Sequence, residues 1–373
     1  MYQETIKKIH RHFFFLIFFL FLFSIALFTA RSMVLDLNLS GPLKEGVFVL
    51  LLPAPFLFIL AEILYRHLDN LFTRIIYLIG SYIGGIFSYW FMASVVLSLI
   101  YVLSLFFKIG YFFQLSFFLY SLALLFVIIG IFQAFKIKIK KYSVKVPAQY
   151  PQLAGKKFAL VADTHFGPVN QEIFARRLFE KIIKEKPDAV FFPGDMFDSE
   201  CYKDAENIKR EIKVLTSRTP VFFSPGNHEQ YGPFNHFMQI ASEGGMTVLI
   251  DETVRFSGVP IFGLNFRQTK NADEVKKTIG ENISPESPAI VLNHEPVFQN
   301  LLSDAGAFLV VSGHTHNGQF WPLKYGSKIF YGKFSYGLEK IGGLTSITTS
   351  GAGTWFAPLR TFNTPEIVVI EFK

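Results

Sequence analysis

The chain has 373 residues, which is enough for two domains, and Phe alone supplies 45 of them. Its formal net charge of +7 is unevenly distributed. Residues 1–145 carry 13 Lys and Arg against 5 Asp and Glu, whereas the remaining residues carry 23 against 24. Basic flanks beside membrane helices explain this balance, so no nucleic-acid partner is expected. The single cysteine, Cys201, excludes an intramolecular disulfide and is expected to be an inert thiol.

Long apolar stretches before residue 136 predict a bundle of about four transmembrane helices, which forms a domain over residues 1–135. About 20 uncharged residues are enough for a helix to cross the hydrocarbon layer. The first stretch is longer than a usual signal-peptide core, so we expect an uncleaved span. Pro53 and Pro55 are expected to kink or break the second, and the third is long enough for one tilted helix or two tight ones. The expected spans are residues 12–30, 46–65, 75–107 and 111–135.

The distribution of Lys and Arg predicts the orientation of these spans. With four spans, ten basic residues fall on one side of the membrane and three on the other. The more basic side faces the cytoplasm. The ten are Lys7, Lys8, Arg11, Arg66, Arg74, Lys136, Lys138, Lys140, Lys141 and Lys145, and the three are Arg31, Lys44 and Lys108. We therefore expect a multi-pass protein of the cell inner membrane whose C-terminal domain is cytoplasmic.

Residues 136–155 are expected to form a basic linker between two domains. The run KIKIKKYSVKV alternates basic and apolar residues, which predicts a strand or an extended segment at the membrane surface. Its lysines either pair with anionic headgroups or are simply solvated.

From residue 156 the pattern changes to short apolar runs that alternate with amphipathic stretches. KFALVAD, DAVFFPGD, PVFFSPGNHE, AIVLNHE and AFLVVSGHTH are typical of buried strands, and QEIFARRLFEKIIKEK has helical spacing. Later runs, GVPIFGL, TSITTSG and PEIVVIEF, indicate strands without long helices between them. Continuous apolar strands that alternate with helices occur in sheets covered on both faces. The sequence therefore predicts an α/β fold over residues 156–373, a layered sandwich with mixed sheets.

Five of the predicted strands end in a residue that can bind metal: Asp163, Asp195, Asn227, His294 and His314. Sites in open α/β sheets assemble at the carboxyl ends of the strands. The spacing of Asp163 and His165, and of His314 and His316, places both side chains of each pair on one side of the chain. Imidazole and carboxylate together suit Mn, Fe or Zn, and two such ions need a carboxylate that bridges them. These residues therefore predict a centre with two divalent metal ions.

The order of these motifs resembles that of the calcineurin-like metallophosphoesterase superfamily, whose domain is an α/β/β/α sandwich, over residues 156–373. Gly313–Gln319 resembles the G-H-T-H-x-G-Q motif of a membrane-attached bacterial subgroup, although the family often has Gly in place of Asn317. The resemblance implies that Asp195 bridges two metals and that His228 contacts the phosphoryl oxygen or protonates the leaving group, with Asp198 orienting it. It also implies Asp163, His165 and His316 as ligands of the first metal, and Asn227, His294 and His314 as ligands of the second.

The resemblance implies a membrane-anchored phosphoesterase that hydrolyses a phosphate ester by attack of a metal-activated hydroxide. Membrane attachment favours an amphiphilic ester, such as a lipid-linked phosphodiester or pyrophosphate, and UDP-2,3-diacylglucosamine is one hypothesis. The alternative is a catalytically inactive metal-binding membrane sensor or scaffold. A transport path has little support, because the spans contain almost no charged residues.

Some residues near the motifs are outside the implied ligand set. Arg360 either binds phosphate or lies on the surface. Glu229 is expected at the surface. Aromatic side chains beside the motifs either grip acyl chains or bases or pack in the core. They are Phe166, Phe197, Tyr202, Tyr231, Phe234 and Trp355.

Overall fold

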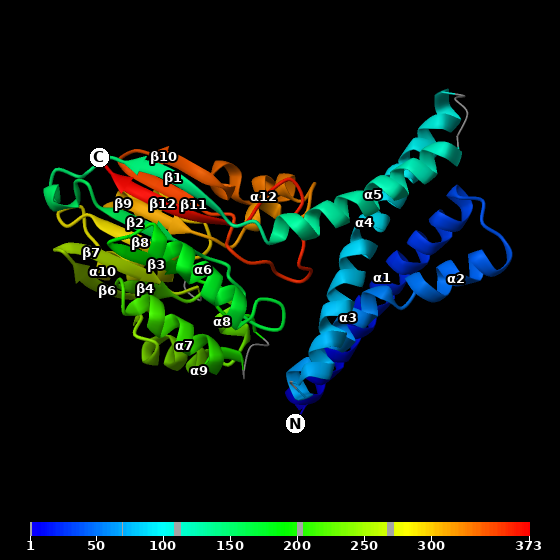
Figure 1. Cartoon of the computed structure of the whole chain (residues 1–373), viewed down its shortest axis with the longest axis horizontal. Helices are drawn as coiled ribbons and strands as arrows, with labels where there is room; N and C mark the ends of the chain where they lie inside the picture. The colour runs from blue at the N-terminus through cyan, green and yellow to red at the C-terminus, as the bar shows by residue number, and fades with distance from the viewer. Residues whose placement is uncertain (1, 69, 108–112, 200–203, 267–271) are drawn as a thin grey trace. The chain divides into compact units, whose positions relative to one another are not determined.

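The computed structural model describes residues 2–68, 70–107, 113–199, 204–266 and 272–373. Lys108, Cys201, Tyr202 and the first two residues of the expected fourth span lie outside these residues. The chain divides into two compact units, Met1–Ile129 and Gly130–Lys373. The first unit is helical, and the second combines strands and helices (Figure 1).

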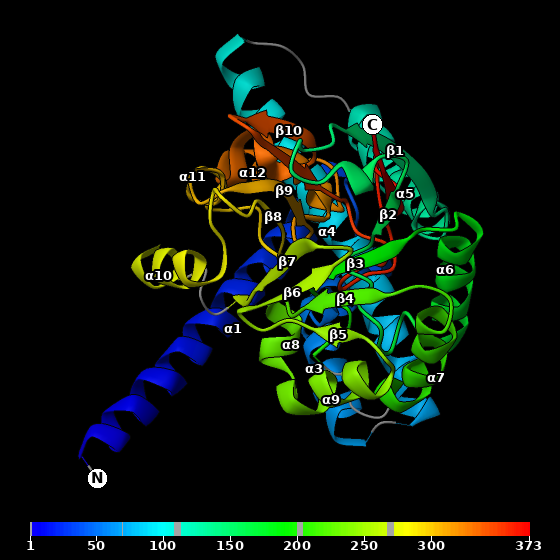
Figure 2. The same cartoon turned by 90° about the vertical axis from the view of Figure 1, so that its left-hand side faces the viewer.

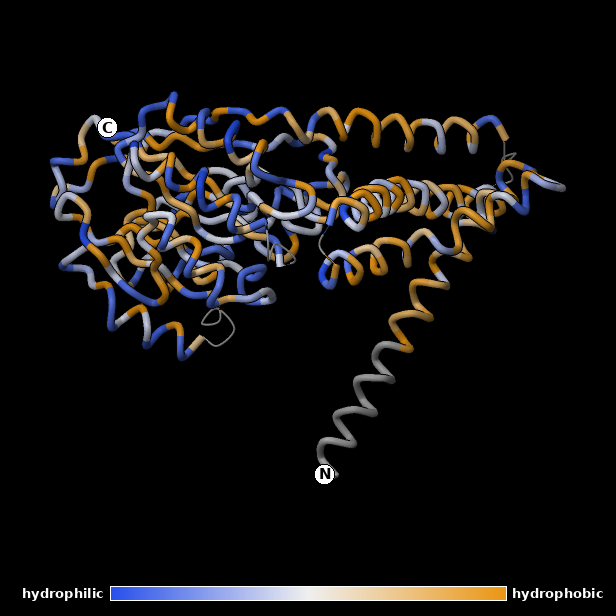
Figure 3. The backbone as a smooth tube through the Cα atoms, turned by 60° about the horizontal axis from the view of Figure 1, so that its bottom comes forward, coloured by the Kyte–Doolittle hydropathy of each residue, from blue (hydrophilic) through white to orange (hydrophobic). Residues whose placement is uncertain are grey.

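Long apolar helices make up the first unit, and Figure 3 shows hydrophobic residues along them. The helices are α1 (Tyr2–Asp36), α2 (Gly41–Leu51), α3 (Ala54–Leu68), α4 (Leu71–Phe107) and α5 (Phe113–Ala134), whose last turn belongs to the second unit. Four stretches are long and apolar enough to cross a membrane: Leu16–Asp36, Gly41–Leu68, Leu71–Phe107 and Phe113–Ala134. The prediction of about four apolar helices is therefore confirmed. By length and composition, these helices indicate a membrane protein.

The structure of the second and third stretches decides between alternatives that the sequence left open. The second divides into α2 and α3 at Pro53, and Pro55 lies in the first turn of α3, where a missing N–H removes no helical hydrogen bond. The third is the single helix α4 of 37 residues. At a rise of 1.5 Å per residue it is about 55 Å long, which exceeds the ~30 Å hydrocarbon layer. Such a helix must tilt or extend beyond that layer.

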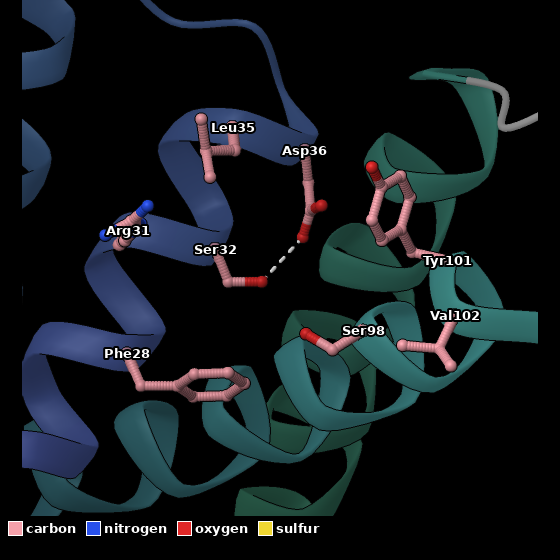
Figure 4. Close-up of a pocket in the computed structure, with 8 residues that line it drawn as sticks. All are labelled: Phe28, Arg31, Ser32, Leu35, Asp36, Ser98, Tyr101 and Val102. Atoms are coloured by element: carbon pink, nitrogen blue, oxygen red, sulfur yellow. Dashed lines mark hydrogen bonds between the residues drawn. The ribbon is translucent and has the colours of Figure 1, made fainter. Parts of the chain in front are cut away.

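Polar side chains of the first unit line a pocket of about 450 Å³ between α1 and α4, which includes Arg31, Ser32 and Asp36 (Figure 4). Asp36 Oδ2 accepts hydrogen bonds from Ser32 Oγ at 2.8 Å and from Tyr120 OH on α5 at 3.1 Å. Tyr120 OH also lies 2.9 Å from Ser94 Oγ on α4. Lipid tails offer no hydrogen-bond partners, so polar groups among apolar helices must satisfy one another. This network therefore links α1, α4 and α5.

Two six-stranded mixed sheets form the centre of the second unit (Figure 2). The first sheet has the order β1-β12-β2-β3-β4-β5 and is parallel except between β12 and β2. The second has the order β10-β11-β9-β8-β7-β6, and only its two outermost pairs are antiparallel. The strands are β1 (Lys138–Val144), β2 (Lys157–Leu160), β3 (Ala189–Pro193), β4 (Val221–Ser224), β5 (Thr247–Val248), β6 (Glu252–Phe256), β7 (Val259–Leu264), β8 (Ala289–Asn293), β9 (Ala307–Ser312), β10 (Gly337–Ile341), β11 (Leu344–Thr348) and β12 (Glu366–Phe372).

Helices cover the outer face of each sheet, so the predicted α/β/β/α sandwich is confirmed (Figure 2). Leu178 of α6 packs in one apolar layer with the first sheet, and Ile279 of α10 packs in another with the second. Phe191 and Leu292 belong to the apolar layer between the sheets. The helices are α6 (Glu172–Lys184), α7 (Asp204–Thr216), α8 (Asn227–Tyr231), α9 (Phe234–Glu243), α10 (Ala272–Asn282), α11 (Gln299–Asp304) and α12 (Lys324–Tyr331), with 3-10 turns η1 (Pro151–Leu153), η3 (His316–Gly318) and η4 (Gly332–Ser335).

The basic segment expected as a strand or an extended linker forms the edge strand β1, which pairs in parallel with β12. Two of its lysines bond within the second unit. Lys140 Nζ donates to Tyr336 OH at 3.1 Å, and Lys141 Nζ lies 3.4 Å from Glu185 Oε2. These contacts favour a structural use of the basic residues over contact with lipid headgroups.

Candidate metal centre

The candidate site lies at the carboxyl ends of five parallel strands, three from the first sheet and two from the second. Each strand is buried on both faces and ends at a turn, so the first polar residues after it emerge at the same edge of the unit. Asp163 and His165 follow β2, Asp195 follows β3, Asn227 opens α8 after β4, His294 follows β8, and His314 and His316 follow β9.

The structure brings all seven predicted metal ligands together. The first group consists of Asp163, His165 and His316. His165 Nε2 lies 3.0 Å from His316 Nε2, and His316 Nε2 lies 3.9 Å from Asp163 Oδ1. The second group consists of Asp195, His294 and His314. Within each group, the potential ligand atoms lie within 4.8 Å of one another.

Asn227 and Asp195 connect the members of the second group. Asn227 Oδ1 lies 3.0 Å from both His294 Nε2 and His314 Nδ1. Asp195 Oδ2 lies 3.1 Å from His294 Nε2 and 3.9 Å from His165 Nε2 of the first group. Asp195 therefore lies between the two groups, where a bridging carboxylate would be needed.

The burial of these side chains and the protonation of His314 and His316 fit a bound divalent cation. Asp163 Oδ2 and His165 Nδ1 are buried and have no hydrogen-bond partner among the described residues. Burial, with His165 nearby, holds the pKa of His316 well below its usual range. Burial and the neighbouring His294 lower the pKa of His314 to about 3. Both imidazoles are therefore neutral, which is the form that binds metal.

The backbone at the site has an unusual conformation. Left-handed φ angles occur at Asp163 (50°), His165 (43°), Asp195 (51°), His314 (69°) and His316 (48°). Such angles are uncommon for residues other than glycine and cluster at functional sites. The glycines allow a close approach, because a Cβ on Gly194 would lie 2.5 Å from His294 Nδ1. A Cβ on Gly313 would lie equally close to Asp163 Oδ2.

The predicted catalytic pair, His228 and Asp198, lies beside the candidate ligands. His228 Nδ1 is 2.7 Å from Asp198 Oδ1, and the His228 backbone N–H donates to Asp195 Oδ1 at 2.9 Å. Burial lowers the pKa of His228, but the charges of Asp195 and Asp198 outweigh it and raise this pKa to about 10. His228 is therefore protonated at neutral pH, with Asp198 bonded to one of its ring nitrogens.

Glu229 is a site residue that the sequence did not identify. The expectation of a surface position is wrong, because this side chain is fully buried. Its carboxylate accepts hydrogen bonds from the backbone N–H groups of Gly226 at 2.7 Å and of Asp195 and Phe197 at 2.9 Å. Burial raises the pKa of Glu229. Glu229 therefore fixes the two loops that carry Asp195 and Asn227, and only its place directly after Asn227 and His228 hinted at this role.

We expect Glu229→Gln to lower the free energy of unfolding by about 3 kcal/mol, because an amide cannot accept all three bonds and leaves a buried donor unpaired. Thermal unfolding of the detergent-purified protein measures this change. Glu243→Gln is the matched control, since Glu243 is exposed and pairs with Lys209 at the surface. An unchanged midpoint for Glu229→Gln would contradict a structural role for its carboxylate.

Arg360 was expected either to bind phosphate or to lie on the surface. The surface alternative is wrong, because the side chain is completely buried. Its Nη2 donates to Gly353 O at 2.6 Å and lies 3.3 Å from His316 Nδ1. Its Nη1 donates to His316 O at 3.4 Å. Arg360 therefore supports His316 from the side opposite to the first ligand group.

Four of the six aromatic residues near the motifs divide into two sets. Phe166 and Phe197 are fully buried in the layer beside the first sheet, so they are core residues. Tyr231 and Trp355 are 62% and 49% exposed, and the ring centroid of each lies 6.1 Å from that of His228. These two rings remain available to a substrate.

The chain is similar to several known proteins. The family model for calcineurin-like phosphoesterases matches residues 156–318. An uncharacterized metallophosphoesterase of Campylobacter jejuni is 31% identical over 244 residues, which cover 63% of each chain. The UDP-2,3-diacylglucosamine pyrophosphatase LpxG of Chlamydia muridarum is 22% identical over 63% of this chain and 89% of its own.

The chain spans about three-fifths of the length of the first curated relatives it matches, 63% for the Campylobacter protein and 59% for one from Helicobacter pylori. Among solved structures, a dimetal phosphatase from Danio rerio matches 53% of this chain and 88% of its own, with 13% identity and a TM-score of 0.35. By the family model and the sequence relatives, the chain is therefore similar to calcineurin-like metallophosphoesterases.

Proposed function

We propose that this protein is a membrane-anchored phosphoesterase that hydrolyses a phosphate ester at a centre of two divalent metal ions, Mn, Fe or Zn. The observation that carries this proposal is the position of Asp195 between two groups of buried ligands at the carboxyl ends of five strands. Asp163, His165 and His316 would hold one ion, and Asn227, His294 and His314 the other. Asp195 would bind both.

The bound metals would supply positive charge for the phosphoryl oxygens and lower the pKa of a bound water, so that hydroxide is the nucleophile near neutral pH. The protein's residues prepare the leaving group. Asp198 accepts from His228 Nδ1, which leaves the other ring nitrogen to donate a proton to the departing oxygen. The raised pKa of His228 keeps that proton in place until the ester bond breaks.

We further propose an amphiphilic substrate, a lipid-linked phosphodiester or pyrophosphate, processed on the cytoplasmic side of the inner membrane. The basic flanks of the spans support this orientation. The four apolar helices support a substrate that resides in the membrane. Tyr231 and Trp355 provide exposed rings beside His228 that suit an acyl chain or a base. The similar LpxG protein, named for a nucleotide lipid that it cleaves, adds support for this class of substrate.

The test is hydrolysis of bis-p-nitrophenyl phosphate and p-nitrophenyl phosphate by the full chain in detergent, with Mn²⁺ and with chelator. We expect turnover that requires the metal, and the preferred reagent distinguishes diester from monoester chemistry. If folded protein cleaves neither reagent, nor a lipid-linked pyrophosphate, with any divalent metal, the proposal fails and a metal-binding sensor or scaffold remains.

A further inference from the structure

Helix α12 and its flanks expose apolar side chains to an unusual degree. None of the residues in α12 is buried. Ile329 and Phe330 are 81% and 83% exposed. We define the apolar α12 surface as Trp321, Leu323, Tyr325, Ile329, Phe330 and the neighbouring Phe362, whose ring centroid lies 5.8 Å from that of Trp321. Exposed apolar patches of this kind mark contact with a protein partner or a membrane.

One end of this surface lies next to the last turn of α5, which belongs to the second unit. The backbone N–H of Arg360 donates to Gly130 O in the last turns of α5 at 2.9 Å. A Cβ on Gly130 would lie only 2.9 Å from Thr361 Cγ2, so the loop packs directly on the helix. Thr361 Oγ1 in turn accepts from the backbone N–H of Trp321 at 2.7 Å. The apolar α12 surface therefore begins beside the last turn of α5, the part of that helix that belongs to the second unit.

The other end of α12 reaches the metal centre. Tyr331 OH, at the last residue of the helix, donates to Glu295 Oε1 at 2.9 Å, and Glu295 follows His294 directly. The Tyr331 ring stands edge-on to the His314 ring, with centroids 5.8 Å apart. Eight residues of helix span about 12 Å. The segment from Trp321 to Tyr331 thus connects the loop at Thr361 with two candidate metal ligands.

The charges around α12 identify the partner as lipid. Lys324 and Lys328 lie on the helix, Lys333 follows it, and no acidic residue occurs between Trp321 and Leu338. Apolar side chains among lysines are typical of helices that lie in the interface of an anionic membrane. We propose that the apolar α12 surface inserts into the lipid leaflet from which α5 emerges, and that a membrane-embedded phosphate ester reaches the metal centre along it. The second half of this inference rests on the proposed phosphoesterase function.

The first experiment measures lipid contact without relying on activity. Phe330→Cys in a Cys201→Ser background carries a fluorescent label, and the full chain is placed in phosphatidylcholine–phosphatidylglycerol nanodiscs. Ile173→Cys on α6 is the matched control, since Ile173 is also apolar and 64% exposed. We expect doxyl-labelled lipid to quench the label at position 330 and not at position 173. Equal quenching at both positions, or none at position 330, would overturn the insertion.

The second experiment tests delivery of the substrate with two diesters that differ only in their alkyl chain, ethyl and hexadecyl p-nitrophenyl phosphate. We expect Ile329→Ser/Phe330→Ser to lower kcat/KM about ten-fold or more for the hexadecyl diester in nanodiscs, because two apolar contacts with lipid are lost. Hydrolysis of the ethyl diester should not change. Ile173→Ser/Val214→Ser, also at exposed apolar positions, should affect neither.

The outcomes separate the two proposals. Equal loss on both diesters, or no loss on the hexadecyl diester, would overturn delivery along α12. If the wild-type protein cleaves neither diester, the phosphodiester form of the proposed function fails, while the quenching result still decides whether α12 contacts lipid.

Discussion

Asp195→Asn is expected to reduce metal-dependent turnover of bis-p-nitrophenyl phosphate by at least about 10³-fold, which corresponds to about 4 kcal/mol of transition-state stabilisation. The substitution removes one negative charge and little else. Asn can still accept from the His228 backbone N–H through Oδ1, and the bond from the residue 195 backbone N–H to Glu229 is unaffected. The lost group is Oδ2, which lies between His294 and His165. An amide there cannot bridge two cations.

Two measurements separate this role from a general defect. Titration calorimetry with Mn²⁺ should show weaker binding in Asp195→Asn, while thermal unfolding of the metal-free protein should change little. Asp188→Asn is the matched control, because Asp188 is a carboxylate outside the candidate site that pairs with Lys156 at 2.7 Å. Wild-type turnover and wild-type Mn²⁺ binding in Asp195→Asn would show that Asp195 bridges no metals.

The layers of the fold could be predicted, because the sequence patterns of its strands and helices are local. Buried strands such as β3 and β8 are continuous apolar runs, and α6 has a clear helical period. The pairing of β1 with β12 could not be predicted, because it joins residues more than two hundred positions apart and an alternating basic strand resembles a linker. Whether α4 was one helix or two was also undetermined, since the run is long enough for two tight spans and has no charged residue that would mark a loop between them.

The candidate site could likewise be predicted only in part. The grouping of the candidate metal ligands could be predicted because each follows a strand, and parallel strands bring their carboxyl ends together. Glu229 could not be identified, since its partners are backbone N–H groups, which have no sequence signature. The burial of Arg360 was likewise undetermined, because it depends on the loop at residues 351–353 and on the turn after His316, which meet only in the folded unit.

Arg360→Lys is expected to weaken Mn²⁺ binding by about 10- to 100-fold, the usual effect of removing a group that orients a metal ligand. Lysine keeps the positive charge but lacks the planar arrangement of donors that lets Arg360 reach Gly353 O, His316 O and His316 Nδ1 at once. Without these contacts the His316 ring can rotate away from His165 and Asp163. Because buried carbonyls lose their donors, the free energy of unfolding should also fall by about 2 kcal/mol.

The dependence of turnover on Mn²⁺ concentration distinguishes a positioning role from a purely structural one. If Arg360 positions His316, the concentration of Mn²⁺ needed for half-maximal turnover should rise in Arg360→Lys, and saturating Mn²⁺ should restore most of kcat. Arg255→Lys is the matched control, because Arg255 also donates to a backbone carbonyl, that of Gly258 at 2.8 Å, but on the exposed strand β6. A lowered unfolding temperature with an unchanged Mn²⁺ requirement would assign Arg360 to the stability of the loop alone. A raised Mn²⁺ requirement would instead show that the guanidinium supports the metal centre, because Arg360 can act on the ion only through His316, the ligand that it orients.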